Sequence, residues 1–347
     1  MTAVVQQTRL NWLLPASGFL AVVALLLVIA IGVSVGELSI PLQSVFYAIT
    51  NKIGLTEAPL NRIYESVIWD FRLSRALVAA CCGAGLAICG AVLQSLLKNA
   101  LAEPYVLGVS AGASTGAVSV VVLGIGIGSG TVTLSAGAFA GAFTAFAFVA
   151  LLTNGARGGS ERTILAGVAA SQLFNAITAY TISTSASAQQ ARDVMFWLLG
   201  SFSGVRWPEF QLVLVVMLVG LAVCLYYARA LDAFTFGDDA AASLGIAVPW
   251  VRLILFIVTA LMTATIVSMA GSIGFVGLVV PHVMRFFFGP LHRTLLIASA
   301  LAGAILMVLA DIASRLLIAP QSLPVGVVTA LVGVPFFAMI IYRSRNK

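Results

Sequence analysis

The sequence predicts an all-α polytopic membrane protein with about ten transmembrane helices and both termini in the cytoplasm. Of its 347 residues, 61% are hydrophobic and only 9% are charged, whereas a soluble domain carries roughly a quarter of charged residues. The apolar residues form long runs, and an α-helix needs about 20 of them to cross a bilayer. We therefore expect one transmembrane domain over residues 1–347.

The apolar runs give ten predicted spans in order along the chain. The first run exceeds the ~7–15 residues of a signal-peptide core and has no clear cleavage site, so we expect it to be retained. The eighth is short, and the polar stretch at 183–190 indicates a broken helix after the fifth. The predicted spans are 13–35, 76–97, 105–124, 133–153, 163–183, 210–228, 251–270, 275–288, 295–313 and 325–342.

The distribution of lysine and arginine predicts the orientation of these spans. With the N-terminus inside, eleven of them fall on the inner side and seven on the outer side, which favours cytoplasmic termini. Arg72, Arg75 and Arg315 are exceptions on the outer side, where they could snorkel to the lipid interface. Asp311 lies four residues before Arg315, on the same helical face. We expect Asp311, and Asp70 beside Arg72, to hold these guanidinium groups.

Several classes of function are disfavoured by the composition. The net charge of +6 is dispersed rather than gathered in a stripe, so we expect no nucleic-acid partner. No clustered nucleophile and base and no GxxxxGK[ST] loop are present, so we expect no catalytic residue and no cofactor on this chain. The four cysteines lie inside apolar runs without metal-ligand spacing, and we predict no metal site. They are Cys81, Cys82, Cys89 and Cys224.

Acidic residues bear on the class of transporter. Each one lies in a predicted loop or near the end of a predicted span. An ion-coupled secondary transporter usually keeps an ionisable residue deep within a span. Ion coupling through a buried carboxylate is therefore disfavoured here, and any uphill transport would draw its energy from a partner.

A long inner connection between the sixth and seventh spans is the first sign of such a partner. The segment at 230–250 reads "ALDAFTFGDDAAASLGIAVPW". It predicts a short helix with an acidic start at Asp239, a stop at Gly245 and Pro249 soon after. A short amphipathic helix on this face can lie in a groove of a partner protein, with a plain solvated connector as the alternative.

This segment resembles the coupling segment of ABC-importer permeases, an acid followed by two alanines and a glycine four residues later. Asp239, Ala240, Ala241 and Gly245 match it, with Asp in place of the commoner Glu. Three other stretches resemble the FecCD/BtuC-like permeases of type II ABC importers, which import iron chelates, haem and vitamin B12. They are "RLSRALVAACCGAGLAICGAVLQSLLKNALAEPYVLGVSAGAS" (72–114), "MAGSIGFVGLVVPHVMR" (269–285) and "ADIASRLLIAPQSLPVGVVTALVGVPFF" (310–337).

The resemblance implies a permease subunit of a binding-protein-dependent importer in a bacterial inner membrane. Its implied partners are a second permease subunit (the same chain or a paralogue), two cytoplasmic ATPase subunits that bind ATP and Mg²⁺, an extracytoplasmic substrate-binding protein and membrane lipid. A ferric siderophore is the first substrate candidate, with haem or a corrinoid as alternatives. An ATP-independent secondary transporter is the alternative from another class.

Residue roles follow from the same resemblance. Arg72, Arg75 and Arg315 would receive acidic residues on the two lobes of the binding protein. The ATPase would be contacted by the stretch comprising Asp238, Asp239, Ala240, Ala241 and Gly245.

The fifth span would line a translocation path between two permeases. Its polar residues at helical spacing are Asn175, Thr178, Thr181 and Ser185. Hydroxyls and amides that bond between helices are the alternative explanation of this pattern.

Glycine, alanine and proline positions predict how the spans pack. Small residues recur every fourth position in the second span and at Gly137 and Gly141 in the fourth, which permits close helix packing or a subunit interface. Pro104 and the stretch "GSIGFVGLVVPH" (271–282) interrupt apolar segments. These interruptions predict either discontinuous helices that can rock or tight connections in a crowded bundle.

Overall fold

The computed structural model describes residues 2–36, 40–123, 133–153, 159–185, 187–319 and 321–344. Within these ranges the secondary structure is helical apart from an isolated bridge between Ile318 and Gln321. Each predicted span coincides with a helix, which confirms the predicted all-α architecture. The helices are α1 (Thr2–Ser34), α4 (Ser74–Leu96), α5 (Val109–Leu123), α6 (Leu134–Leu152), α7 (Gly159–Ser185), α9 (Trp207–Tyr226), α12 (Val248–Ala270), α13 (Val276–Phe288), α14 (His292–Leu316) and α15 (Val325–Ser344).

Length separates these helices into two groups. In the described part of the chain, seven are long and apolar enough to cross a membrane, with α4 extended at its start by the helical turns that precede it. The described apolar stretches of three further helices are shorter, at Val109–Val122 in α5, Val276–Phe288 in α13 and Val325–Met339 in α15. α13, which begins and ends within the described residues, is thus too short to cross a bilayer alone.

Short helices connect the long ones. They are α2 (Leu42–Lys52), α3 (Arg62–Ser66), the π-helix η1 (Val67–Leu73), the 3₁₀-helix η2 (Pro104–Leu107), α8 (Ala188–Leu198), α10 (Ala228–Phe234) and α11 (Asp238–Ser243). α2 lies between the first and second predicted spans, where no helix was predicted. The polar stretch at 183–190 is a helix break, as predicted, because Ser187 and Gln190 form a capping box that starts α8.

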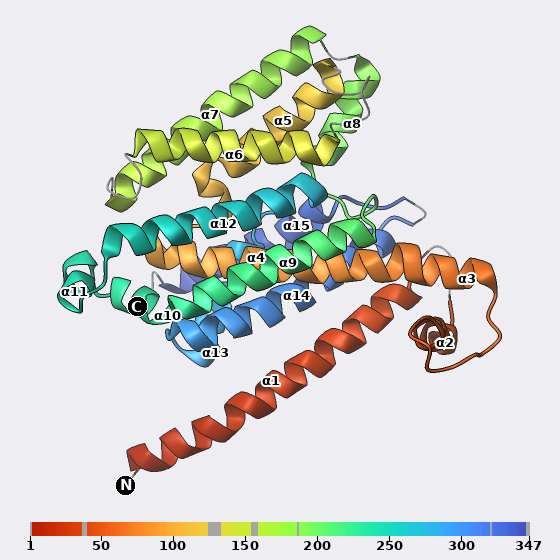
Figure 1. Ribbon diagram of the computed structural model, residues 1–347, viewed down its shortest axis with the longest axis horizontal. Coiled ribbons are helices and arrows are strands. Elements are labelled where there is room, and N and C mark those ends of the chain that lie inside the picture. Colours follow the sequence, from red (N-terminus) through yellow and green to blue (C-terminus); the bar gives the residue numbers. More distant parts are fainter. Residues whose placement is uncertain are drawn as a thin grey trace.

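α4 is the central helix of the bundle, and nearly all of its side chains are buried. It packs against α9, α12, α13 and α14 (Figure 1). Gly83 lies against the backbone of Gly303, so α4 and α14 approach more closely than larger residues would allow. The small residues predicted in this span therefore serve helix packing within the chain.

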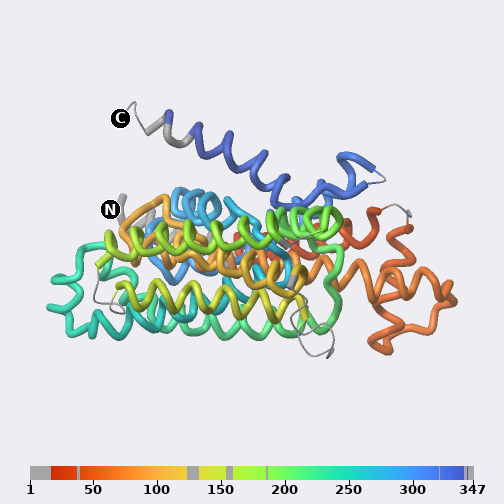
Figure 2. The backbone as a smooth tube through the Cα atoms, turned by 90° about the horizontal axis from the view of Figure 1, so that it is seen from above, coloured from red at the N-terminus to blue at the C-terminus, as the bar shows by residue number. Residues whose placement is uncertain are grey.

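A second body comprises α5, α6 and α7, which form a separate layer beside α12 (Figure 1). Gly112 and Gly116 of α5 face Gly137 and Gly141 of α6 at backbone contact. On the far side of the bundle α1 packs along α14, and α15 projects away from the remaining helices (Figure 2).

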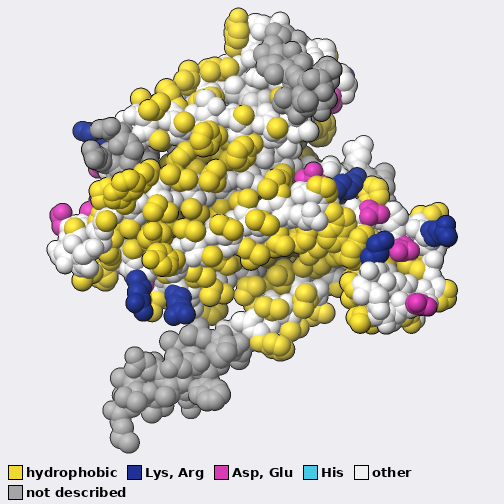
Figure 3. All heavy atoms as spheres, in the orientation of Figure 1, with side chains coloured by type: hydrophobic (Ala, Val, Ile, Leu, Met, Phe, Trp, Pro, Cys, Tyr) yellow, Lys and Arg dark blue, Asp and Glu magenta, His cyan; other side chains and the backbone are white. Residues whose placement is uncertain are grey.

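Charged side chains gather at the two ends of the molecule, and an apolar surface lies between them (Figure 3). This distribution is the one expected of a protein whose middle is surrounded by lipid. One end, called here the arginine end, carries Arg72, Arg75 and Arg315. The other, called here the α11 end, carries Lys98, Asp238, Arg252, Asp232 and His292.

Candidate functional site

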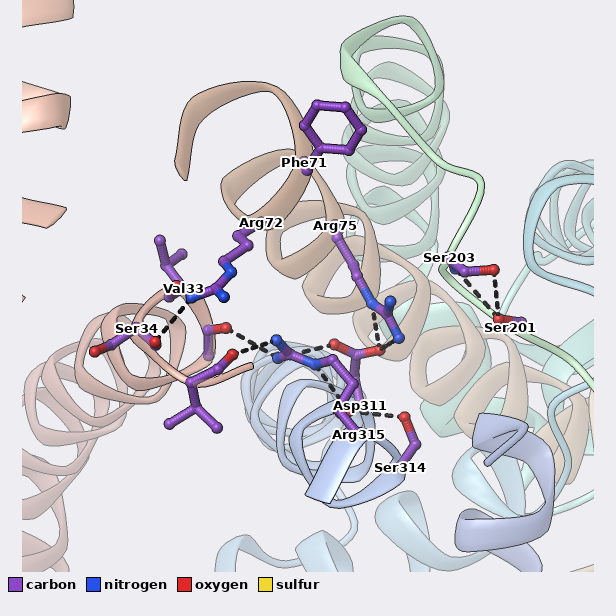
Figure 4. A network of polar contacts seen from close by, with 12 residues as sticks. Val33, Ser34, Phe71, Arg72, Arg75, Ser201, Ser203, Asp311, Ser314 and Arg315 are labelled. Carbon is purple, nitrogen blue, oxygen red and sulfur yellow. Dashed lines mark hydrogen bonds and ion pairs between the residues drawn. The ribbon is translucent and has the colours of Figure 1, made fainter. Parts of the chain in front are cut away.

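The arginine end is built where three helices meet the end of α1 (Figure 4). Arg72 lies in the π-helix η1, Arg75 in the first turn of α4 and Arg315 in the last turn of α14. A π-helical turn often marks a functional site, because its extra residue re-aims neighbouring side chains. Sequence segments more than 200 residues apart are thereby brought into one cluster.

Asp311 is the centre of this cluster. Its carboxylate oxygen Oδ1 accepts hydrogen bonds from Arg75, at 2.8 Å from Nε and 2.7 Å from Nη2. Its Oδ2 lies 3.2 Å from Nη2 of Arg315. The carboxylate is only 1% exposed, and the two arginine side chains are 15% and 11% exposed. The predicted role of Asp311 is confirmed, and a single buried carboxylate balances two buried cations.

Arg72 and Arg315 hold the C-terminal end of α1. Arg72 donates to the carbonyl oxygens of Val33 and Ser34 at 3.0 and 2.8 Å. Arg315 donates to those of Val35 and Gly32 at 2.6 and 2.9 Å. The last carbonyls of a helix lack partners within the helix and carry partial negative charge, so cations there satisfy and stabilise them.

Asp70 does not take the role expected of it. It accepts a hydrogen bond from Ser66 at 2.9 Å, on the exposed side of the helix. Asp70 is close to Arg72 in sequence, but residues that are two apart on a helix do not lie on the same face.

The α11 end has a comparable arrangement around Asp238. Arg252 of α12 donates to both carboxylate oxygens, at 2.8 and 2.9 Å, and Lys98, just past α4, lies 3.1 Å away. Burial would raise the pKa of Asp238, but the hydrogen bonds and charges of Lys98 and Arg252 outweigh it and hold the pKa below its ordinary value. Asp238 therefore faces the bundle and fixes the start of α11.

Two further contacts tie α10 to the bundle. Asp232 accepts hydrogen bonds from the backbone N–H of His292 at 2.8 Å and lies 2.6 Å from its Nδ1. Ser95 of α4 donates to the carbonyl of Leu231 at 3.1 Å. The segment at 230–250 is thus joined to α4, α12 and α14, and a force on it would reach all three.

The outer face of this segment exposes three large apolar side chains beside polar ones. Asp239 is exposed, whereas Ala241 is fully buried and Ala240 is partly buried. Gly245 has a φ of 80°, which supports the predicted helix stop. Phe236, Leu244 and Trp250 are 83%, 73% and 68% exposed. The sequence analysis did not single out these three residues; large apolar residues in a loop between spans were the available signal.

The four predicted path residues do not share one face of α7. Thr178 is buried, and its hydroxyl lies 2.8 Å from that of Thr115 on α5. Thr181 is also buried and donates to the carbonyl of Ile177 at 2.9 Å. Asn175 is exposed, and the side chain of Ser185 lies outside the described residues. The threonines therefore follow the alternative considered above, hydrogen bonding within and between helices.

Potential metal ligands are dispersed in the described part of the chain. No three His, Cys, Asp or Glu residues there come close enough to hold an ion. All four cysteines are buried and unpaired.

Comparison with known proteins decides the family. The profile of the FecCD transport family matches residues 20–343, almost the whole chain. The chain belongs to the FecCD transport family.

Individual relatives agree with this FecCD assignment. The chain is 38% identical to the cobalamin import system permease protein BtuC of Halobacterium salinarum, over 92% of this chain and 82% of the relative. It is 36% identical to the iron(3+)-hydroxamate import system permease protein FhuB of Bacillus subtilis, over 91% and 80%. It is 39% identical to the vitamin B12 import system permease protein BtuC of Salmonella newport, over 81% and 85%.

A solved structure supports the same conclusion for the fold. An inward-facing metal-chelate type ABC transporter superposes with a TM-score of 0.83 at 28% identity, covering 95% of this chain and 99% of that one. This FecCD protein is therefore a multi-pass inner-membrane permease of an ABC importer. It is a transport component rather than an enzyme, and ATP hydrolysis belongs to a separate subunit. An ATP-independent secondary transporter is excluded.

Proposed function

We propose that this FecCD permease imports a metal chelate, with a ferric siderophore as the first candidate. The observation that carries the proposal is similarity, over nearly the full chain, to a transporter of metal-chelate type and to a hydroxamate-iron permease. A corrinoid is the second candidate, because relatives of 38% and 39% identity are named for cobalamin or vitamin B12.

The proposed orientation places the arginine end outside and the α11 end in the cytoplasm. The bias of lysine and arginine supports it. So does the course of α1, which ends among the arginines and whose residues Ser17 and Gly18 lie in one groove with Arg293, at the start of α14. Both termini would then be cytoplasmic.

At the outer end, we infer that a substrate-binding protein docks near Arg72, Arg75 and Arg315. Arg75 and Arg315 form ion pairs with Asp311, while Arg72 and Arg315 also anchor the end of α1. Acidic side chains of the partner would compete with the α1 carbonyls and Asp311 for the same guanidinium groups. Docking would then act directly on α1, α4 and α14.

At the cytoplasmic end, we infer that the segment at 230–250 couples the permease to its ATPases. Phe236, Leu244 and Trp250 form the exposed face that would enter a partner's groove, since buried aromatic and aliphatic anchors dominate interface energies. Asp238, with its two cations, would position this face rather than touch the ATPase. Two permease subunits would complete the unit, as identical copies or as paralogues.

The translocation path is proposed along the exposed face of α7. Gln172, Asn175 and Ser183 lie on that face, while Thr178 and Thr181 support it from behind. A bulky Asn175→Trp substitution should block uptake, whereas Thr178→Val should retain most of it. Uptake by Asn175→Trp equal to that of the parent would place the path elsewhere.

Uptake by cells tests the substrate. A deletion strain and its complemented parent would receive labelled ferric hydroxamate and catecholate siderophores, haem and cobalamin, each with and without ATP depletion. The proposal predicts loss of ATP-dependent uptake of a ferric siderophore on deletion. Loss of cobalamin uptake alone would favour the corrinoid candidate, and unchanged uptake of every metal chelate would contradict the proposal.

A further inference from the structure

Two stretches of backbone that are not α-helical meet at half the depth of the bundle. One is Glu103–Gly108, which leads into α5, and the other is Gly271–Phe275, between α12 and α13. A Cβ added to Gly277 would lie 2.7 Å from Cδ of Pro104 and 2.8 Å from the carbonyl oxygen of Leu86. Leu86 lies at the middle of α4, so both stretches lie at that level.

This depth changes the interpretation of Glu103. It was expected in a loop between two full spans, and it does lie outside the helices. The loop, however, returns into the bundle before α5 begins. An acidic side chain therefore lies at the depth of the middle of α4, where the sequence pattern indicated none.

Tyr105 of the first stretch and Ser110 of α5 bind the second stretch. The Tyr105 hydroxyl donates to the carbonyl of Ile273 at 2.7 Å and accepts from the N–H of the same residue at 2.8 Å. Ser110 donates to Ser272 at 3.0 Å. These side chains thus supply Gly271–Phe275 with hydrogen bonds that a continuous helix would have made within itself.

Such replacement is needed because backbone polar groups at membrane depth have no water to bind. The second stretch also holds Phe275 at a φ of 69°, a conformation that is costly for a bulky residue and is kept only where its surroundings impose it. The Phe275 side chain packs on Gly333 of α15, which has no Cβ to obstruct it. Strain of this kind gathers at sites that move or bind.

The two stretches belong to different bodies. η2 and α5 are part of the α5–α6–α7 layer, whereas α13 packs on α4 and α14 in the main bundle. Both stretches contain a glycine in the left-handed region, Gly108 at a φ of 71° and Gly271 at 72°. Hinges use a few residues at the ends of elements to absorb a change in backbone angles.

We propose that Gly271–Phe275 is a hinge between the α5–α6–α7 layer and the main bundle, and that Tyr105 is the residue that positions it. Because one hydroxyl holds both the N–H and the carbonyl of Ile273, a movement of η2 moves this segment. α13 follows, because it begins at Val276, directly after this segment. Rotation of the layer that carries α7 is thereby transmitted to α13 and α15 during transport.

Tyr105→Phe tests this directly, since it removes one hydroxyl and leaves the ring. Tyr226→Phe, at the exposed end of α9, is the matched control. Spin labels on Phe143→Cys of α6 and Ile297→Cys of α14, both exposed, would report the distance between the two bodies. Measurements on the purified permease–ATPase complex, without nucleotide and with trapped ATP, require no knowledge of the substrate.

The control should show two distinct distance distributions, one for each nucleotide state. Tyr105→Phe should give one broad distribution in both states, together with uptake at least tenfold lower. Two sharp distributions identical to those of the control would overturn the proposal. If Tyr105→Phe does not assemble, Ser110→Ala serves instead. Its distance distributions should be partly broadened in both nucleotide states, and distributions equal to those of the control would overturn the proposed hinge. The proposed substrate would stand in either case.

Discussion

The ion-pair clusters at the two ends of the bundle are similar in composition but differ in how deeply their carboxylates are buried. At each end one carboxylate holds two cations from different helices, Asp311 at the arginine end and Asp238 at the α11 end. The Asp311 side chain is 1% exposed, whereas that of Asp238 is 39% exposed; of the two partners of Asp238, Lys98 is 41% exposed and Arg252 only 7% exposed. A buried pair that loses one member leaves an uncompensated charge, whereas an exposed pair exchanges readily with water.

This difference indicates that the two ends have different roles. The arginine end fixes α1, α4 and α14 to one another, and a partner can act there only by competing for buried groups. The α11 end keeps its carboxylate near water, so α11 can shift against the exposed Lys98 at little cost, while the buried Arg252 keeps it joined to α12. A permease driven by ATPases from one side needs compliance at that side.

The largest effect should follow Asp311→Asn. The substitution leaves the guanidinium groups of Arg75 and Arg315 buried without a counter-charge, which costs about 3–5 kcal/mol of folding free energy. We expect a strongly lowered thermal unfolding temperature in detergent, with loss of assembled permease. Asp70→Asn, exposed at the same end, is the control. Equal unfolding temperatures for the two variants would contradict the assigned role of Asp311.

Arg72 separates the anchoring of α1 from docking of a binding protein. Arg72→Lys keeps the positive charge but loses the guanidinium geometry at the α1 carbonyls, and Arg72→Gln also loses the charge. If docking is electrostatic, stimulation of the ATPase by the binding protein should fall several-fold in Arg72→Gln and persist in Arg72→Lys. The loss should shrink at high salt, because screening already weakens docking there. Equal stimulation in both variants would show that the charge at Arg72 takes no part in docking.

Asp238→Asn should have a smaller effect on stability. The exposed pair with Lys98 contributes about 0–1 kcal/mol, but the substitution also leaves Arg252, only 7% exposed, without its counter-charge. The unfolding temperature should therefore fall, though less than in Asp311→Asn, where two arginines lose their partner. The α11 segment would nevertheless lose its anchor to Lys98 and Arg252, and transport per ATP hydrolysed should decrease. Glu161→Gln, an exposed acid in the first turn of α7, is the control. An unchanged ratio of transport to ATP hydrolysis in Asp238→Asn would show that the contacts of Asp238 with Lys98 and Arg252 serve stability alone.

The smallest expected effect concerns pH. Because the pKa of Asp238 is lowered from 3.8 in the folded state, its contribution is present above that value and is lost only as pH falls below it. The ratio of transport to ATP hydrolysis should therefore be flat between about pH 5.5 and 8. A step in that window which disappears in Asp238→Asn would contradict the direction of the shift.

Much of the fold could be predicted because the length of an apolar run is a direct measure of a span. The ten helices begin and end within a few residues of the predicted bounds, except at α1, α5 and α7. The pair Asp311 and Arg315 was predictable for a similar reason, since spacing of four fixes a shared helical face.

The remainder depends on information that local sequence does not carry. The contact of Asp311 with Arg75 joins residues 236 apart. α7 has polar residues on several faces, so spacing alone did not show that Thr178 and Thr181 point inward. The depth of Glu103 depends on a loop that returns into the bundle, whereas the apolar run that follows it looks like an ordinary span.

Photo-crosslinking at both ends in intact cells would test the central claim most directly. A crosslinking amino acid would replace Leu244 at the α11 end or Ile63 at the arginine end, both of which are exposed. The account predicts that position 244 links to the cytoplasmic ATPase and position 63 to the extracytoplasmic binding protein. Links to the opposite partners, or to one partner from both positions, would contradict it.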